Sequence, residues 1–293
     1  MSITVIIPTL CESSRRNLLL RAIESIQVQE QSVQILVVVN GQRFDSNLLE
    51  TLKARSDIDV LQIFEGSSPK AQLIGRRHVS SEYFSFLDDD DEYLPGALDI
   101  RLSLLQQDIT ADLVVTNGFS SKNGNDRLTY SHMSNVKNYP LKALFQENWL
   151  ASCNHLFRSS GVPTKYFEDP HPYTEWTWLA YRLALDGKKI IASDVPTFRY
   201  NDTPGSLSKS SIFIMSSITL YGRMLSLNPK SDIVKIIRKR LCNAWHNVSV
   251  FELKSGHRTK AILAHLRSLT CHWSGLKFTS YTRHLLGNIS RNP

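Results

Sequence analysis

The chain has 293 residues, of which 42% are hydrophobic and 21% charged, and it carries a formal net charge of +7. On folding, a chain of this length buries about three-quarters of its surface, which is enough for one large domain or two unequal ones. The composition excludes a disordered or collagen-like chain, and no apolar run reaches the roughly 18 residues that a membrane-spanning helix needs.

The first 117 residues alternate short apolar runs with segments of helical periodicity. The apolar runs predict strands at residues 3–7, 35–39, 60–64, 83–87 and 113–116. The periodic segments predict helices at residues 48–54, 70–79 and 94–107, and an earlier helix that Ser13 or Ser14 caps and whose apolar face runs from Leu18 to Ile26. Because the strands are apolar along their whole length, this pattern is typical of a mainly parallel sheet covered by helices on both faces.

The rest of the chain has a different pattern. Residues 118–139 are rich in Gly, Asn and Ser, and they predict a loop or a short hairpin. Beyond them we expect strands at residues 154–158, 189–192 and 195–200, and a helix at residues 174–186. After residue 206 the periodicity is helical only, and Gly256 separates two helices that would form a helical hairpin.

The net charge is distributed unevenly along the chain. Residues 1–208 carry 20 basic and 25 acidic residues, a net −5, whereas residues 209–293 carry 14 basic and only two acidic residues, a net +12. A strongly basic tail indicates an anionic partner, which could be a membrane surface, a nucleic acid or a phosphorylated substrate. The four cysteines lack any spacing typical of zinc sites, so the simplest interpretation is a reduced, cytoplasmic compartment.

Four consecutive carboxylates, Asp88 to Asp91, follow the expected strand at residues 83–87 directly. In an open parallel sheet, ligands bind beyond the carboxyl ends of the strands. Hard oxygen ligands of this kind suit Mn²⁺ or Mg²⁺, above all when a phosphate completes the coordination shell. The alternative is a solvated acidic turn that stabilises the start of the helix near Leu94. The buried strand before the acidic run favours the metal-binding interpretation.

Several segments carry a family resemblance. They include Thr4-Val5-Ile6-Ile7-Pro8-Thr9, Gly75-Arg76-Arg77, Phe86-Leu87-Asp88-Asp89-Asp90-Asp91 and Thr174-Glu175-Trp176. These resemble the opening strand, the Ala-Arg-Asn element, the Leu-Asp-x-Asp-Asp motif and the acceptor-side helix of the family 2 glycosyltransferases. The resemblance covers residues 3–208. It implies an α/β fold of the glycosyltransferase A type, in which helices flank a mainly parallel, Rossmann-like sheet, here with a C-terminal helical extension.

The resemblance assigns roles on the donor side of the site. Asp88 and Asp89 would contact the nucleotide of the donor, Asp88 at its ribose or base. Asp90 would ligate the Mn²⁺ or Mg²⁺ that bridges the diphosphate. Pro8 and Thr9 would line the pocket of the base.

Three further residues complete the predicted site. Arg76 would lie near the nucleotide or the diphosphate, unless it is a plain helix-surface residue. Asn40 stands in Val39-Asn40-Gly41, where the family usually has Asp-Asp-Gly, and it could hydrogen-bond the base. Glu175 falls where the family places its catalytic base, although a carboxylate at a helix start is stabilising without any catalysis. Thr174 replaces the first acid of the family's Glu-Asp pair, which leaves Glu175 alone.

These assignments predict an inverting, metal-dependent glycosyltransferase. It would move a sugar from a nucleotide-diphosphate donor to a hydroxyl of a glycan or lipid-linked acceptor, in surface polysaccharide synthesis. A sugar hydroxyl is a poor nucleophile, so a carboxylate must accept its proton, and the departing diphosphate needs cations. Two alternatives stay open: a nucleotidyltransferase on a similar fold, for which Arg15-Arg16 would be the phosphate-binding loop, and a non-catalytic protein that binds nucleotide-sugars or glycans.

The predicted organisation has two parts. Residues 1–208 form the catalytic domain, with a nucleotide-sugar-binding half (1–117) and an acceptor-binding half (118–208). Residues 209–293 form the basic helical region, which we expect to dock the protein on anionic lipid at the inner face of the cell membrane. We expect no nucleic-acid partner, because the chain contains no recognised nucleic-acid-binding motif and such a partner would leave the acidic run unexplained.

Overall fold

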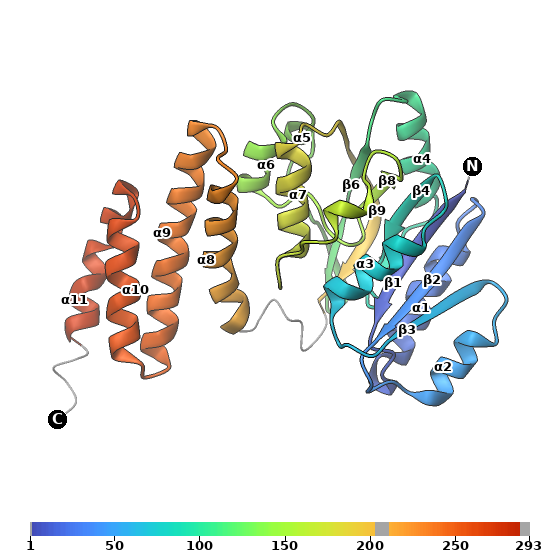
Figure 1. Cartoon of the computed structure of the whole chain (residues 1–293), viewed down its shortest axis with the longest axis horizontal. Coiled ribbons are helices and arrows are strands. Elements are labelled where there is room, and N and C mark those ends of the chain that lie inside the picture. The colour runs from blue at the N-terminus through green and yellow to red at the C-terminus, as the bar shows by residue number, and fades with distance from the viewer. Residues whose placement is uncertain (1, 203–210, 288–293) are drawn as a thin grey trace. The chain divides into compact units, whose positions relative to one another are not determined.

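A computed structural model of the chain describes residues 2–202 and 211–287 (Figure 1). The chain divides into two compact units by its internal contacts. Unit 1 comprises Met1–Pro170 and Glu175–Pro204, and unit 2 comprises His171–Thr174 and Gly205–Pro293.

Unit 1 is built on one nine-stranded sheet. Its strands lie in the order β3-β2-β1-β4-β8-β6-β9-β5, and β7 pairs with β6 outside this path. β1 to β4 are parallel to one another, β6 and β9 are also parallel, and β8 runs antiparallel between β4 and β6. The strand bounds are β1 Ile3–Thr9, β2 Val33–Asn40, β3 Ile58–Ile63, β4 Tyr83–Phe86, β5 Glu92–Tyr93, β6 Leu113–Lys122, β7 Asn125–Leu128, β8 His155–Arg158 and β9 Ile190–Asn201. The predicted fold class is confirmed.

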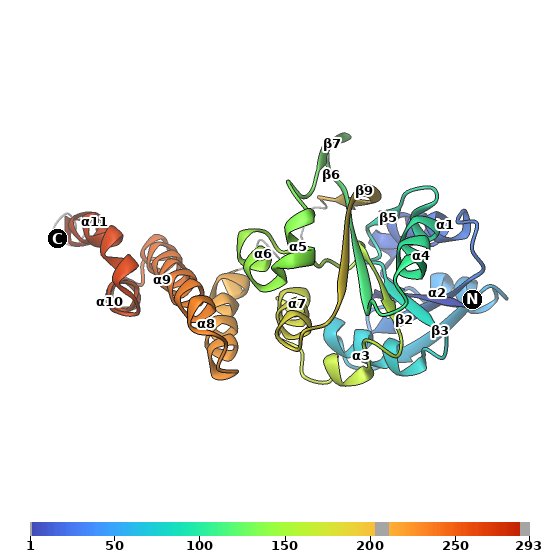
Figure 2. The same cartoon turned by 90° about the horizontal axis from the view of Figure 1, so that it is seen from above.

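Helices cover both faces of the sheet (Figure 2). Their bounds are α1 Arg16–Gln27, α2 Ser46–Lys53, α3 Ser68–His78, α4 Ala97–Gln107, α5 Ser134–Asn138, α6 Pro140–Gln146 and α7 Glu175–Leu185. The central strand β4 shows how the two faces differ. Phe84 and Phe86 point to the face of α3 and α7, whereas the hydroxyl of Ser85 lies 2.7 Å from that of Tyr93 on the opposite face. All four residues of β4 are buried, which explains the uninterrupted apolar character of this run.

Several boundaries differ from the sequence-based expectations. β1 continues through Pro8 to Thr9. The Ile6 carbonyl accepts the Leu87 amide, so the backbone of Ile6 faces β4. The nitrogen of Pro8, two residues further on, faces the same side, where β4 has already ended, so the missing N–H of proline costs no hydrogen bond. Ser13 does not cap α1: it opens a 3₁₀ turn and donates to Asp45, and α1 begins at Arg16.

The second half of unit 1 agrees with the expectations in part. Residues 118–139 contain the expected short hairpin, because β6 extends to Lys122 and turns into β7, but the helix α5 that follows was not expected. The two short strands expected at residues 189–192 and 195–200 form one strand, β9, which is irregular near Pro196. The two-residue strand β5 was not expected, and it is too short to show a pattern.

From Ser211 to Gly287, unit 2 consists of helices stacked in chain order (Figure 1). Their bounds are α8 Ser211–Ser226, α9 Ser231–Lys254, α10 Arg258–Thr270, the 3₁₀ helix η4 Trp273–Phe278 and α11 Thr279–Gly287. α9 and α10 form the expected hairpin, in which Gly256 takes a positive φ of 80°. The Cα atoms of Cys242 and Cys271 lie 6.0 Å apart, a distance that a disulfide can span. Within the described residues, every helix is too short or too polar to span a bilayer.

Candidate active site

The acidic run lies at the carboxyl edge of the parallel strands. β1 is flanked by β2 and β4, so the residues that end these strands meet there: Thr9 on β1, Asn40 on β2, and the run from Asp88 after β4. Asn40 Nδ2 donates to the Thr9 carbonyl at 3.0 Å and braces this edge. The segment between β4 and β5 thus brings its carboxylates next to the loop that follows β1, as expected of a ligand-binding edge.

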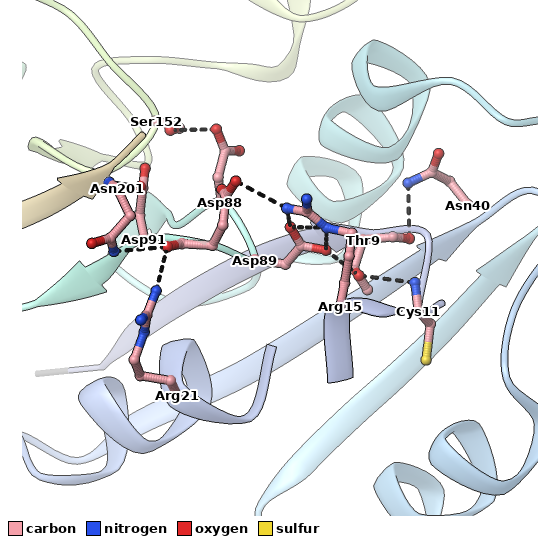
Figure 3. A network of polar contacts seen from close by, with 11 residues as sticks. Thr9, Cys11, Arg15, Arg21, Asn40, Asp88, Asp89, Asp91, Ser152 and Asn201 are labelled. Atoms are coloured by element: carbon pink, nitrogen blue, oxygen red, sulfur yellow. Dashed lines mark hydrogen bonds and ion pairs between the residues drawn. The ribbon is translucent and has the colours of Figure 1, made fainter. Parts of the chain in front are cut away.

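Asp89 is the anchor of the cluster (Figure 3). Its buried carboxylate accepts the Thr9 hydroxyl at 2.6 Å and the Arg15 Nε at 3.1 and 3.2 Å from its two oxygens. A terminal nitrogen of Arg15 pairs with Asp89 as well, and the same nitrogen lies 3.0 Å from Asp90 Oδ2. The hydrogen bond to Asp89 raises the pKa of Arg15 above its usual value. Arg15 is therefore a fixed cation between two carboxylates.

Asp88 has a different environment. It is half-buried, and its Oδ2 accepts the Ser152 hydroxyl at 2.7 Å. Burial, followed by the charge of Asp90, raises the pKa of Asp88 to about 7, and the charges of Asp89 and Glu175 act in the same direction. At neutral pH, Asp88 is therefore balanced between its charged and neutral forms, and a cation at this position would favour the carboxylate.

Asp91 and the backbone of Asp90 tie the acidic run to β9. Asp91 is fully buried, and its Oδ1 accepts the Asn201 amide at 3.0 Å. The Asn201 side chain and Arg21 both donate to the Asp90 carbonyl at 2.8 Å. Burial and the charges of Asp88 and Asp90 raise the pKa of Asp91 well above its usual value. Asp91 thus serves to position the loop, and the carboxylate of Asp90 lies beside Arg15 at this edge.

Glu175 is the first residue of α7, and it is half-buried. The neighbouring Trp176 packs against Phe86 and His155, with ring centroids 5.4 and 5.1 Å apart, so the first turn of α7 is fixed against the ends of β4 and β8. Because the charge of Glu175 raises the pKa of Asp88, the two carboxylates lie within electrostatic range of each other. The helix start therefore presents a second acid to the cluster.

The buried His155 supports this arrangement and is not a candidate acid or base. Burial and Arg101 lower its pKa to about 3, so the ring is neutral. Its Nε2 accepts the Phe86 amide at 3.2 Å, and its Nδ1 lies 2.8 Å from the Ala151 carbonyl. Arg101 is also fully buried and donates to the carbonyls of Cys153 and His155. Together they hold the segment that carries Ser152.

Most of the predicted site residues meet at this edge. Thr9, Asn40, Asp88, Asp89 and Asp90 lie together, and Glu175 lies within range of Asp88. Pro8 is buried inside β1, directly behind Thr9.

Arg76 is not part of this group. It is buried, and it donates to the carbonyls of Ser159 and Val162, which follow β8. β8 runs antiparallel to β4 and its end pairs with Tyr83, the start of β4, so Arg76 lies at the amino edge of the sheet. The structure thus places Arg76 at the end of β4 opposite to the carboxylates.

The sequence pointed to neither Ser152 nor Asn201, and it offered Arg15 only as part of a phosphate-binding loop in the nucleotidyltransferase alternative. Arg15 had a further signal, because it lies in the loop after the first strand, where a cation would face the acidic run. Ser152 and Asn201 had none, since only the pairing of β8 and β9 with the rest of the sheet brings them there.

The acidic residues suit a metal only with help from a substrate. The described residues contain no group of three or more His, Cys, Asp or Glu side chains arranged for a metal ion. Asp88 and Asp90 are hard oxygen donors. Burial and then the charge of Asp90 raise the pKa of Asp88, and a divalent cation would relieve the repulsion between the two carboxylates. Mg²⁺ is commonly bound by one or two carboxylates together with substrate phosphates. The residues fit a metal of this kind, shared with a diphosphate.

Comparisons with known proteins agree with the fold. Residues 4–161, more than half of the chain, match the sequence profile of glycosyl transferase family 2, and the chain belongs to this family. No curated protein sequence matches the chain.

Solved structures of S. aureus TarS share the fold. Residues 1–349 of TarS in complex with UDP-GlcNAc superpose with a TM-score of 0.64 at 14% identity, over 92% of this chain and 81% of that one. The complex of the same residues with UDP gives a TM-score of 0.60 at 14% identity, over 89% and 75% of the two chains.

Proposed function

We propose that the protein is an inverting glycosyltransferase that moves a sugar from a nucleotide-diphosphate donor to an acceptor hydroxyl. The observation that carries this proposal is that two acidic groups lie near each other at one edge of the sheet. Asp88, Asp89 and Asp90 follow β4, and Glu175 opens α7 within electrostatic range of Asp88. One acidic group can hold the divalent cation that accompanies the donor diphosphate, and the other can accept the proton of the acceptor hydroxyl.

The residues after β1 and β4 would bind the donor. Thr9 and Asn40 end adjacent strands, and together with Pro8 behind them they would form the floor of the base pocket. Asp88 and Asp89 would contact the nucleoside, and Asp90 would hold Mn²⁺ or Mg²⁺ together with the diphosphate. The metal would supply positive charge to the departing diphosphate. Arg15, which pairs with Asp89 and Asp90, takes the place of Arg76 as the cation of this site.

Glu175 would be the general base. A carboxylate at this place can accept the proton of the acceptor hydroxyl as its oxygen attacks the anomeric carbon of the donor. The bond from the anomeric carbon to the diphosphate breaks as the new glycosidic bond forms, and the leaving group takes the electron pair. A single displacement of this kind inverts the configuration at the anomeric carbon.

For both the donor and the acceptor, a chemical class can be proposed. The TarS complexes with UDP-GlcNAc and UDP support a nucleotide-sugar donor, and UDP is the first nucleotide to test. For the acceptor we propose a glycan or a lipid-linked glycan of surface polysaccharide synthesis. The enzyme would work in the cytoplasm at the inner face of the cell membrane, which is where a lipid-linked acceptor and its soluble donor can meet.

The first experiment measures release of UDP from UDP-GlcNAc with Mn²⁺, in the presence and absence of EDTA. We expect slow metal-dependent hydrolysis by the wild type, and its loss in Asp90→Ala. Thermal shifts with UDP, ADP and GDP, each with Mn²⁺, identify the base if another donor is used. Binding of a nucleoside diphosphate without any turnover of its sugar conjugates would instead indicate a non-catalytic binding protein.

A second experiment tests whether Glu175 acts in the transfer step and not in donor binding. Glu175→Gln should lower turnover by about 10²- to 10⁴-fold and leave the UDP-induced thermal shift unchanged. Glu168→Gln is the matched control, because Glu168 is an exposed acid of the same unit, paired with Arg77. If both Asp90→Ala and Glu175→Gln retain full activity, the assignment of the site is wrong.

A further inference from the structure

The C-terminal end of unit 2 combines exposed apolar side chains with positive charge. Among the described residues, fourteen large hydrophobic side chains are exposed, and five of them lie between residues 263 and 286. They are Leu263, Leu266, Trp273, Leu276 and Leu286, with exposed fractions of 51% to 77%. Residues 257–287 contain five Lys or Arg residues and no Asp or Glu.

These side chains lie at the free edge of the helix stack. α10 packs against α9 through Ala261, Ala264 and Ser268, which are buried. Leu263 and Leu266 are one turn apart on the exposed side of α10, and the exposed Lys260 and Arg267 lie next to them on the helix surface. The apolar side chains are therefore flanked by cations.

The 3₁₀ helix η4 adds an aromatic group to this surface. A Cβ on Gly275 would lie 2.0 Å from the Ser268 carbonyl oxygen, so η4 is seated directly on α10. This close packing fixes the backbone of η4 while Trp273 and Leu276 remain 77% and 61% exposed. Lys277 follows them on the surface. An exposed Trp beside Leu, Lys and Arg is typical of segments that lie in the interface of a membrane.

We propose that this surface, formed by Leu263, Leu266, Trp273 and Leu276 with Lys260, Arg267 and Lys277, binds the headgroup region of an anionic phospholipid bilayer. The argument for this occupant is charge: residues 257–287 contain five Lys or Arg residues and no Asp or Glu, and an anionic leaflet attracts each nearby Lys or Arg. The apolar side chains would then enter the boundary between headgroups and acyl chains. The inference deepens the membrane part of the proposed function and names the surface responsible.

Vesicle flotation tests this proposal without any glycosyl transfer. We use the full chain with vesicles of phosphatidylcholine and 30% phosphatidylglycerol, and with vesicles of phosphatidylcholine alone. Binding is expected only to the anionic vesicles. It should weaken strongly between 0.1 M and 1 M NaCl, because the Debye length falls from about 10 Å to about 3 Å. Equal binding to both vesicle types, or none to either, would overturn the proposal.

Two pairs of variants locate the surface. Trp273→Ser and Lys260→Glu should each lower the partition coefficient by about tenfold or more. Ile109→Ser and Lys137→Glu are matched controls, because both residues are exposed in unit 1, and they should bind as the wild type does. Circular dichroism checks that each variant is folded. The proposal fails if the control variants lose as much binding as the test variants.

Sedimentation of the free protein distinguishes a second copy of the chain as the occupant. A monomer that binds anionic vesicles supports the proposal. A dimer that Trp273→Ser dissociates would show that the surface joins two copies, and would overturn it. Loss of vesicle binding with retained release of UDP from UDP-GlcNAc separates this surface from the catalytic site.

Discussion

Asp88 occupies a position that disfavours the charged form of its carboxylate. The pH dependence of stability can therefore report on the site. Its pKa is about 7 in the folded protein, because of burial and the charge of Asp90, against about 4 for an ordinary Asp. Between these two pH values the folded state binds a proton that the unfolded state does not. The free energy of unfolding contributed by this group is therefore highest below about pH 4 and falls as the pH rises to about 7.

Asp88→Asn removes this pH-dependent loss. Asn keeps an acceptor for the Ser152 hydroxyl and carries no charge at any pH. Relative to the wild type, the variant should gain about 2 to 4 kcal/mol of stability between pH 4 and pH 8, while donor turnover is lost. Urea unfolding at both pH values measures the difference. A difference that is constant with pH would show that Asp88 is ionised throughout.

Substitution of Arg76, the arginine predicted from the sequence, and of Arg15, the arginine found at the carboxylates, should have different effects: the first on stability and the second on UDP binding. Arg76 stacks over the Phe84 ring and donates to buried carbonyls, so Arg76→Gln should cost about 1 to 3 kcal/mol in unfolding free energy and leave turnover per folded molecule unchanged. Arg15→Gln should instead weaken UDP binding with Mn²⁺ by at least about tenfold, because it removes the cation of the cluster. Thermal shifts with UDP and urea unfolding measure the two effects. A loss of UDP binding in Arg76→Gln alone would contradict our placement.

Among the elements, α3 shows why a motif can be recognised and still be assigned to the wrong place. In a β–α–β unit the helix runs back from the carboxyl edge of the sheet to its amino edge. Arg76 lies in the last turn of α3, so the geometry of the crossover places it at the amino edge. Resemblance of a short segment to a family motif carries no information about which edge it faces.

By contrast, the acidic run could be placed from the sequence. The apolar runs of β1, β2 and β4 predict buried parallel strands, and the carboxylates follow β4 without an intervening residue other than Leu87. What could not be predicted are the contacts made by long-range pairing. β9 brings Asn201 to Asp91 from 110 positions away, and no local pattern encodes that approach.

The close packing of α3 on the sheet depends on a residue without a side chain. A Cβ on Gly75 would lie 2.5 Å from Ile6 Cγ2 and 3.3 Å from Val38 Cγ2. Gly75→Ala should therefore push α3 away from β1 and β2 and cost about 1 to 3 kcal/mol in unfolding free energy. Gly222→Ala is the matched control, because Gly222 is inside α8 and a Cβ there would extend into open space. There we expect a neutral or slightly stabilising effect, since Ala favours a helix by about 1 kcal/mol.

Chemical denaturation of the two glycine variants gives the comparison. If both substitutions change the stability by the same amount, helix propensity alone accounts for the result and the close contact of α3 has no energetic role. A destabilised Gly75→Ala protein that still binds UDP would show that the separation of α3 from the sheet stays local.

For the whole molecule, the net charge of +7 is the sum of an acidic and a basic part of the chain, which have different chemistry. The acidic excess of residues 1–208 includes the carboxylate edge, and the basic excess lies in the helical unit. Unit 2 also contains His246 and His265, and burial is the main cause that lowers the pKa of each below its usual value. A histidine that is neutral when folded and protonated when unfolded makes stability fall as the pH drops below about 6.5.

We therefore expect unit 2 to become less stable in mild acid. His265 is 2% exposed, and its Nε2 lies 2.7 Å from the Thr282 hydroxyl, so protonation requires its local environment to open. Hydrogen–deuterium exchange of α9 and α10, corrected for the intrinsic rate, should be faster at pH 5 than at pH 7. His265→Gln should reduce this acceleration, and the exposed control His257→Gln should retain it. Equal protection at both pH values would show that these histidines are not the acid-sensitive groups of the unit.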